Sequence, residues 1–381
     1  MQHAEQINLG GRLLDYIDQQ YTAEQDGLYH QPIEEYTSAE RAQIEQQLFF
    51  RETPLCLGLS CDLPEPGSYT VHDLTGIPIL LTRDKQGEFH AFLNVCRHRG
   101  SRVAEGCGKA RLFVCPYHAW AYDHTGALVA RPADEAFNGA DRERYGLTPL
   151  PAAERDGFLW VLPTPGKVFD VEDHLSGLAP ELAAYNLADF HLFESVEIKR
   201  KLNWKLMLDT YLESYHFCVL HKNTICSIFY DNLQTFDTYG DHFRLVSPRR
   251  TISALKEQPK ETWDLLPHVV AIYTLFPNSV LVWQLDHIEL WQIFPTAGAP
   301  NEAMTRLSLY TPDPTLTDTA KAHWQKNLDL VVEVVEKEDF PLGEGIQKGF
   351  YSGAQDHIVF GRNEPGLAHF HKGITQQVNA R

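Results

Sequence analysis

The sequence predicts an α+β protein in which a small all-β domain is followed by a larger domain built on an antiparallel sheet. A chain of 381 residues is long enough for roughly two to three domains. Hydrophobic residues make up 43% and charged residues 22%, which is typical of a globular protein and excludes a disordered or fibrous chain. Short β-rich runs precede longer strand-like stretches that alternate with helices. We therefore expect a helical segment over residues 1–45, the small domain over 46–165 and the larger domain over 166–381.

The N-terminal segment is predicted to be helical and to pack on the larger domain. Leu13, Leu14 and Ile17 form a short apolar stripe. Ser38 is a suitable N-cap for a second helix over residues 38–49.

The small domain is indicated by a change of pattern from about residue 55. Apolar residues then fall in short runs such as 77–81 and 89–93, separated by turn residues such as those at 84–87. The last run of this kind covers 158–161, and residues 163–167, with two prolines and a glycine, form the linker that follows.

The larger domain is indicated by longer strand-like stretches at 193–201, 269–276, 280–294 and 304–310. After them a helix is expected to begin near Thr317. Its apolar stripe consists of Ala320, Trp324, Leu328, Val331 and Val335.

Charge and terminal sequence exclude several classes of protein. The 33 basic and 51 acidic residues give a net charge of −18, which disfavours nucleic acid or an anionic membrane as the partner. No apolar stretch approaches the roughly 18 residues of a membrane span, and the N-terminus does not resemble a signal peptide. We therefore expect a cytoplasmic protein with reduced cysteines, whose odd number, 7, also fits a disulfide framework poorly.

Two short loops in the small domain each supply one thiolate and one imidazole. Cys96 and His98 flank one residue, and Cys115 and His118 flank two. Ligand counting allows a tetrahedral zinc site or a Rieske [2Fe–2S] cluster, in which two Cys hold one iron and two His hold the other. A zinc finger usually pairs Cys with Cys and His with His, so the order found here favours the Rieske cluster. The remaining cysteines are predicted to be incidental: Cys56, Cys61, Cys107, Cys218 and Cys226.

A second group of potential ligands lies in the larger domain. Glu213 and His216 are three residues apart and would share one face of a helix. His221 follows His216 by five residues, which places the two about 140° out of phase on a regular helix. Both imidazoles can reach one metal only if the helix ends or bulges between them. Two His and one carboxylate with open positions are typical of non-haem Fe(II) oxygenases.

Asp339 is the candidate for the third ligand. It lies four residues beyond Val335 and continues the apolar stripe, so its carboxylate would face the core and need a partner there. Glu338 is expected to point away. The alternative places Asp339 just past the helix end in a solvated turn, which Pro341 and Gly343 would favour.

From about residue 40 onward the chain resembles the α (oxygenase) subunit of Rieske non-haem iron oxygenases, the ring-hydroxylating oxygenases. The resemblance is carried by the two loops that contain Cys96-Arg-His98 and Cys115-Pro-Tyr-His118, by the spacing of Glu213, His216 and His221, and by residues 337–364. It implies a Rieske domain and a helix-grip (START-like) catalytic domain. It also implies a [2Fe–2S] cluster on Cys96, His98, Cys115 and His118, and a mononuclear Fe(II) on His216, His221 and Asp339, with O2 as co-substrate.

The resemblance further implies electron supply by a ferredoxin, an NAD(P)H-dependent flavin reductase or both. Because electrons in this family cross between subunits, a homotrimer is expected, and the short chain favours one without a β subunit. Arg97, Arg99 and Arg102 surround the first loop and either form a docking patch for an acidic donor or neutralise local charge.

Glu213 departs from many ring-hydroxylating members, which have Asp there. In the family this carboxylate bridges a cluster histidine of the neighbouring subunit to a histidine of the mononuclear iron, so we expect a catalytic role for Glu213. Glu at this place resembles members that act on quaternary amines such as carnitine and glycine betaine.

The main expectation for function is hydroxylation or dihydroxylation of a small aromatic substrate. The alternative is monooxygenation or demethylation of a quaternary amine or of a methoxy or N-methyl compound, and a third possibility is an electron-transfer Rieske protein without oxygenase activity. The candidate residues for the substrate pocket are Phe217, Ile225, Phe229, Tyr230, Tyr273, Trp283 and Trp291.

Overall fold

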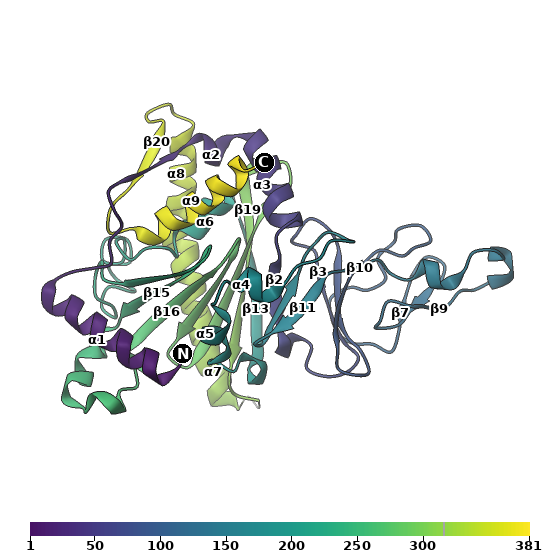
Figure 1. Cartoon of the computed structure of the whole chain (residues 1–381), viewed down its shortest axis with the longest axis horizontal. Coiled ribbons are helices and arrows are strands. Elements are labelled where there is room, and N and C mark those ends of the chain that lie inside the picture. The colour runs from purple at the N-terminus through teal and green to yellow at the C-terminus, as the bar shows by residue number, and fades with distance from the viewer. Residues whose placement is uncertain (315–316) are drawn as a thin grey trace. The chain divides into compact units, whose positions relative to one another are not determined.

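The computed structural model describes residues 1–314 and 317–381, and they form two compact units (Figure 1). The larger unit consists of Met1–Gln46, Leu175–Tyr185 and Phe190–Arg381, and the smaller one of Gln47–His174 and Asn186–Asp189. The smaller unit is built on strands, and the larger unit combines an antiparallel sheet with helices, so the predicted α+β class is confirmed. Within the described residues no helix is both long and apolar enough to cross a membrane.

The smaller unit contains three small antiparallel sheets. Their strand orders are β10-β5-β4-β3-β6, β11-β12-β2 and β7-β8-β9. The predicted turn at 84–87 joins β4 to β5, and Gly87 takes a φ of +87° there, which only glycine adopts readily. The strands are β2 (Leu55–Leu59), β3 (Ser68–His72), β4 (Ile79–Arg83), β5 (Phe89–Leu93), β6 (Cys107–Lys109), β7 (Phe113–Val114), β8 (Ala121–Tyr122), β9 (Leu128–Ala130), β10 (Pro149–Leu150), β11 (Ala152–Arg155) and β12 (Phe158–Val161).

The larger unit is organised around a seven-stranded antiparallel sheet in the order β13-β19-β18-β17-β16-β15-β14. The prediction of one continuous strand over 280–294 is wrong, because a turn at Leu285 and Asp286 divides this stretch into two paired strands. The strands are β13 (His191–Arg200), β14 (Thr235–Tyr239), β15 (His242–Pro248), β16 (Val269–Leu275), β17 (Ser279–Gln284), β18 (His287–Thr296) and β19 (Ala299–Thr311).

The N-terminal segment is not entirely helical as predicted. Its residues Tyr29–Pro32 form β1, which pairs with β20 (His357–Phe360) near the other end of the chain. The helices on either side of β1 are α1 (His3–Gln19), α2 (Glu34–Thr37) and α3 (Ala39–Arg51). The predicted N-cap of α3 is confirmed, because the Ser38 hydroxyl accepts a hydrogen bond from the backbone N–H of Arg41.

One long helical run supplies part of the site. The Thr317 hydroxyl caps α7 (Asp318–Val334) at its N-terminus. The prediction that a helix begins near Thr317 is therefore confirmed. A π-helical segment, Val335–Asp339, continues α7 directly into α8 (Phe340–Phe350). The other α-helices are α4 (Val171–Leu175), α5 (Ala179–Ala183), α6 (Trp204–Asp209) and α9 (Pro365–Asn379). Short 3-10 helices cover Ser60–Asp62, Asp134–Phe137, Arg142–Tyr145, Leu187–Asp189, Arg250–Glu257, Lys260–Thr262 and Leu266–His268.

Candidate metal centres

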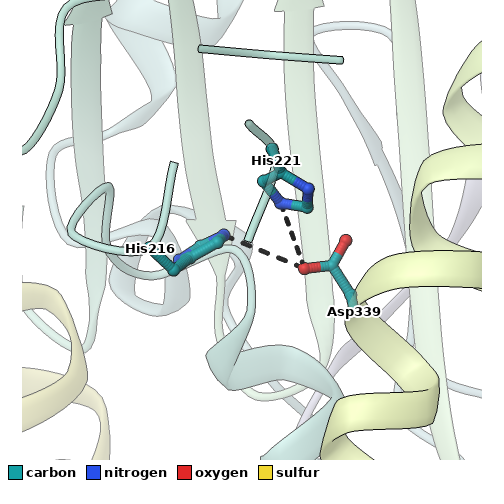
Figure 2. A group of neighbouring side chains, drawn as sticks. All are labelled: His216, His221 and Asp339. Carbon is teal, nitrogen blue, oxygen red and sulfur yellow. Dashed lines mark ion pairs between the residues drawn. The ribbon is translucent and has the colours of Figure 1, made fainter. Parts of the chain in front are cut away.

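His216, His221 and Asp339 come together in the larger unit (Figure 2). One carboxylate oxygen of Asp339 lies 3.2 Å from Nε2 of His221 and 3.8 Å from Nε2 of His216. Asp339 and His221 are buried, and His216 is half-buried. Within the described residues, this is the one group of three or more His, Cys, Asp or Glu side chains whose ligand atoms lie within 4.8 Å of one another.

The two histidines do not lie on a helix. Helix α6 ends at Asp209, and the chain then passes through a series of turns that contains Glu213, His216 and His221. The prediction that Glu213 and His216 share a helix face is therefore wrong, although the two side chains still meet. The expected break in the helix precedes both histidines instead of falling between them.

The unusual helix geometry occurs on the other side of the site, in the π-helical segment that ends at Asp339. A π-helix holds more residues per turn than an α-helix, so neighbouring residues are turned less far apart around the axis. Glu338 and Asp339 consequently both reach His221, Asp339 at Nε2 and Glu338 at Nδ1, the latter over 2.5 Å. The prediction that Glu338 points away assumed the α-helical period and is wrong.

Each histidine is held by a second carboxylate behind its ring. Glu213 contacts Nδ1 of His216, as Glu338 contacts Nδ1 of His221. The Glu338 carboxylate also accepts a hydrogen bond of 2.9 Å from the hydroxyl of Thr224. Such carboxylates fix the orientation and tautomer of a metal-binding imidazole, and here they leave both Nε2 atoms free toward Asp339. Burial opposes protonation of His221, but the carboxylates of Asp339 and Glu338 outweigh it and raise its pKa.

These three residues fit a mononuclear iron. Metal–ligand bonds of about 2.1 Å place the ligand atoms of one ion roughly 3 Å apart, close to the two separations found here. Two imidazole nitrogens and one carboxylate oxygen are the donor set of non-haem Fe(II) oxygenases. The surrounding Glu213 and Glu338 add negative charge that favours a cation in this place.

Two cysteines near the site were predicted to be reduced and incidental, and this is wrong for both. Cys218 and Cys226 form a disulfide, with their Cα atoms 4.6 Å apart. The turns after α6 fold the chain back on itself and bring the two residues together despite their separation of eight. The other three form no disulfide among the described residues: Cys56 is buried, Cys61 is half-buried and Cys107 is exposed.

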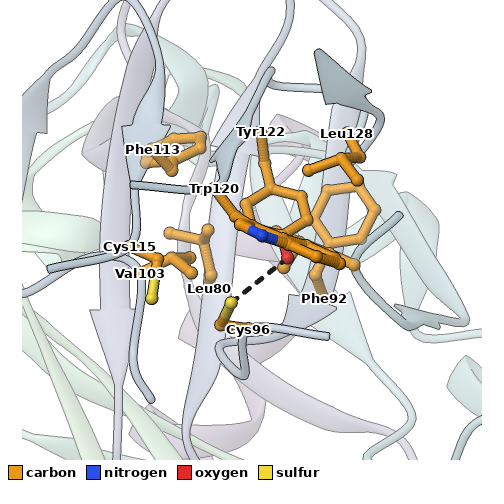
Figure 3. Close-up of a cluster of buried hydrophobic side chains, with 10 residues drawn as sticks. Leu80, Phe92, Cys96, Val103, Phe113, Cys115, Trp120, Tyr122 and Leu128 are labelled. Atoms are coloured by element: carbon orange, nitrogen blue, oxygen red, sulfur yellow. Dashed lines mark hydrogen bonds between the residues drawn. The ribbon is translucent and has the colours of Figure 1, made fainter. Parts of the chain in front are cut away.

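The predicted cluster ligands lie on two loops of the smaller unit. Cys96 and Cys115 are buried in its core with Trp120 and Tyr122 (Figure 3). The rings of His98 and His118 are 4.6 Å apart, and the His98 ring stacks on Trp120. Backbone hydrogen bonds from Gly100 to Cys96 and from Ala119 to Cys115 close each loop on its cysteine.

The arrangement fits a [2Fe–2S] cluster. Nδ1 of His98 is buried and has no hydrogen-bond partner among the described residues, which is costly unless another group binds it. Burial and the nearby His118 and Arg99 lower the pKa of His98 and favour the neutral form that binds metal.

A tyrosine that the sequence did not single out supports the first loop. The Tyr122 hydroxyl lies 3.3 Å from the Cys96 sulfur and accepts a hydrogen bond from the backbone N–H of Arg97 (Figure 3). Neither Tyr122 nor Glu338 has a sequence signal of its own, because each contact joins residues far apart in the chain.

The three arginines around the first loop have different partners. Arg102 forms an ion pair with Asp73, whereas Arg99 donates to the Tyr117 hydroxyl and Arg97 to the Thr148 hydroxyl. Local neutralisation therefore accounts for Arg102, and the docking patch remains a prediction for the other two.

A cavity of about 110 Å³ adjoins the three candidate iron ligands. Its lining residues come from β16, β17 and β18 of the sheet, from α7 and the π-helical segment, and from the turns after α6. Of the predicted pocket residues, Phe217, Ile225 and Phe229 line it. Tyr230, Tyr273, Trp283 and Trp291 are not among its described lining residues. Tyr273 and Trp283 alternate with the lining residues along β16 and β17 and so face the other side of the sheet.

Comparisons with known proteins cover both units. Residues 53–148 match the Rieske [2Fe–2S] domain, and residues 187–380 match the ring-hydroxylating alpha subunit (catalytic domain). The carnitine monooxygenase oxygenase subunit of Acinetobacter baumannii is 31% identical over 377 residues, which cover 95% of this chain and 98% of the relative. The corresponding subunit of Escherichia coli K12 is 27% identical over 358 residues, 91% of this chain and 92% of the relative.

A solved structure gives the same architecture. It is that of a quaternary ammonium Rieske monooxygenase, described in connection with carnitine oxidation and inter-subunit electron transfer. It superposes with a TM-score of 0.79 at 24% identity and covers 91% of this chain and 95% of its own. At this level of identity the likeness shows the fold.

Proposed function

Because this chain belongs to the Rieske oxygenases with a ring-hydroxylating alpha-subunit catalytic domain, we propose that it is the oxygenase component of a quaternary-amine monooxygenase. As a member of this family, the chain is an oxidoreductase that uses a Rieske cluster, a mononuclear iron and O2. Dioxygenation of an aromatic substrate, the main expectation from the sequence, finds no support among these relatives, and the alternative takes its place.

One observation carries the proposal. The similarity to carnitine monooxygenase oxygenase subunits extends over nearly the whole of both chains, including the catalytic domain in which the substrate is bound. Glu213, which distinguishes this chain from many ring-hydroxylating members, lies against His216. The space beside the triad consists of the cavity of about 110 Å³ and a second one of about 290 Å³ that also reaches Glu213, His216 and Asp339.

The proposed reaction is hydroxylation of a C–H bond next to the nitrogen. The C–H bond, O2, two electrons and two protons give C–OH and water, and the hydroxylated carbon then releases an amine and leaves a carbonyl compound. The iron, when bound, would supply the activation of O2 beside the substrate. His216, His221 and Asp339 would hold that iron, and Glu213 and Glu338 would keep the two imidazoles oriented. Phe217 and Phe229 would exclude water, and Phe217 would also attract the cation through its ring face, since the Phe229 ring already carries the guanidinium of Arg249.

The electrons would come from outside the chain. We propose a ferredoxin or a flavin reductase as the donor and Cys96, His98, Cys115 and His118 as the cluster ligands. Inter-subunit transfer, described for the related quaternary ammonium monooxygenase, would require a ring of identical subunits, most simply a homotrimer.

A substrate screen with a surrogate electron donor tests the function. L-carnitine, γ-butyrobetaine, glycine betaine and choline would be compared with benzoate and naphthalene at equal concentration. We expect amine or aldehyde release from at least one quaternary amine, in proportion to O2 consumed and with little peroxide. Product from the arenes alone, or only peroxide with every quaternary amine, would overturn the proposal.

A further inference from the structure

The part of the cavity lining that the sheet contributes carries a carboxylate. Val270 and Ile272 of β16 and Val282 of β17 belong to this part and are apolar. Glu289 of β18 is paired with Val282 across the sheet and therefore projects from the same face. Glu289 is only 4% exposed, although a carboxylate on an apolar wall loses the solvation that water would provide.

The protein satisfies this carboxylate only in part. One oxygen accepts a hydrogen bond of 3.0 Å from the indole N–H of Trp291. The other lies 3.6 Å from Nε2 of His287, which is ion-pair distance but too long for a strong hydrogen bond. A carboxylate offers about four lone-pair positions, so these two contacts leave acceptor capacity on Glu289, which lines the cavity.

Glu289 belongs to a group of charged side chains at the edge of the cavity. His287 lies between Glu289 and Asp286, whose carboxylate is 3.1 Å from Nδ1. Asp286 is also 3.0 Å from Nε2 of His323, so it has a second partner that Glu289 lacks. The guanidinium of Arg249 stacks over Phe229 and donates to Gln284, and its charge acts on Glu289 without a direct contact. Among the described residues, His287 is the one cation within ion-pair distance of Glu289.

A second polar group in the same cavity has no partner. The Tyr211 hydroxyl is buried and makes no hydrogen bond with any described residue, although Tyr211 lines the cavity. Burial, together with the nearby carboxylates of Asp339 and Glu289, raises the pKa of Tyr211 well above its usual range and keeps the hydroxyl protonated. A buried donor without a partner indicates that a molecule from outside the chain fills this space.

We propose that Glu289 is the anionic contact for the ammonium group of the substrate and that it selects cations over neutral molecules of the same shape. The inference rests on the proposed function and specifies the residue that gives it its specificity. A trimethylammonium group has no N–H to donate, so the attraction is electrostatic and depends on the full charge of the carboxylate inside an apolar cavity. Tyr211 supplies a hydrogen-bond donor to an oxygen of the same substrate.

The test compares probes that carry a quaternary ammonium group with isosteres in which that positive charge is absent. The probes are γ-butyrobetaine with 5,5-dimethylhexanoate, and choline with 3,3-dimethylbutan-1-ol, in which a carbon replaces the charged nitrogen. Binding to the holoenzyme would be measured by calorimetry without an electron donor, so that turnover does not enter. The variant Glu289→Gln keeps the size of the side chain and an acceptor for the Trp291 N–H but removes the charge.

We expect the wild type to bind at least one cation about tenfold or more tightly than its isostere, and Glu289→Gln to reduce that ratio to about one. Affinity for the neutral 3,3-dimethylbutan-1-ol should change less than about twofold. The matched control Glu197→Gln removes an exposed carboxylate that pairs with Arg306 on the same sheet, and it should keep the wild-type ratio. A cation preference that survives in Glu289→Gln overturns the inference alone. If the wild type itself shows no cation preference and forms no product from quaternary amines, the proposed function fails as well.

Discussion

At the level of single residues, the geometry of the triad depends on carboxylates that are not part of it. Glu213 and Glu338 each bind the rear nitrogen of one imidazole, and this leaves the two front nitrogens directed at Asp339. Because free rotation of a ligand must be suppressed when the metal binds, such contacts add to metal affinity even though they never touch the ion.

Replacing Glu338 by Gln should weaken iron binding. The amide can still accept a hydrogen bond but no longer carries the charge that favours His221 in its binding orientation, so we expect a loss of about 10- to 100-fold in iron affinity. The measurement is the iron content of the mononuclear site during titration with a chelator. Glu336→Gln, on the exposed side of the same π-helical segment, is the matched control and should retain iron like the wild type. If Glu338→Gln retains as much iron as the wild type, the contact between Glu338 and His221 does not contribute to iron binding.

His287 gives the larger unit a pH-dependent stability. Burial lowers its pKa, but the carboxylates of Asp286 and Glu289 outweigh that effect and raise it to about 9. Since this lies above the ordinary value of about 6.5, the stabilisation is fully present below pH 6.5 and is lost as the pH rises to about 9. The loss amounts to roughly 3 kcal/mol in the free energy of unfolding.

Urea unfolding at pH 6 and pH 9.5 measures this contribution. The comparison is between the wild type and His287→Gln, because other titrating groups contribute equally to both. We expect the variant to lose less stability than the wild type between the two pH values. An identical loss in both proteins would mean that the proton on His287 is not held by its two neighbours.

At the level of elements, the junction between the turns after α6 and the run from α7 to α8 determines the site. The apolar stripe predicts the start of α7, the burial of Trp324 and Leu328, and the inward placement of Asp339 correctly. It could not predict the π-helical segment, because a stripe with a period of 3.6 residues looks the same whether or not one turn widens near its end. The role of Glu338 follows from that widening and was missed for this reason.

The same limit applies to the segment between α6 and β14. Its spacing of potential ligands was informative about chemistry, because two His and a carboxylate are needed for iron, but not about backbone conformation. The turns that position His216 and His221, and that bring Cys218 to Cys226, are not periodic. Of the seven-stranded sheet, the apolar stretches predicted β13, β16 and β19 and the joined pair β17 and β18, whereas β14 and β15, which follow this segment, were not predicted.

The packing of α3 against α6 depends on a buried ion pair. Nζ of Lys205 lies 2.6 Å from both oxygens of Glu45, and both side chains are almost completely buried. Burial lowers the pKa of Lys205, while Glu45 counteracts this. Glu45 also accepts hydrogen bonds from Trp204 and Arg41. Removing only the carboxylate would leave the ammonium buried without its counter-charge.

Glu45→Gln should therefore destabilise the larger unit by about 3–5 kcal/mol, as measured by chemical denaturation. In the double variant Glu45→Gln with Lys205→Met the unpaired charge is gone, so most of that loss should be recovered. If the single variant is as stable as the wild type, the pair contributes nothing and another contact must hold α3 in place.

At the level of the whole molecule, the two candidate metal sites belong to different compact units. The cluster ligands Cys96, His98, Cys115 and His118 lie within the smaller unit, and the iron triad lies within the larger one. Each unit has its own sheets and its own buried side chains. Loss of one metal site should therefore leave the other intact, because no ligand is shared between them.

Metal analysis of two variants tests this independence. The wild type should contain about three iron and two labile sulfide per chain, the sum of a [2Fe–2S] cluster and one mononuclear iron. His216→Ala should retain about two iron, both sulfides and an unchanged visible spectrum but lose turnover, because the triad then has one imidazole fewer. Cys115→Ser should lose the sulfide and the colour yet keep about one iron on the triad. Loss of sulfide in His216→Ala, or loss of all iron in Cys115→Ser, would contradict this expectation. Either result would mean that one metal site assembles only when the other is intact, although the two share no ligand.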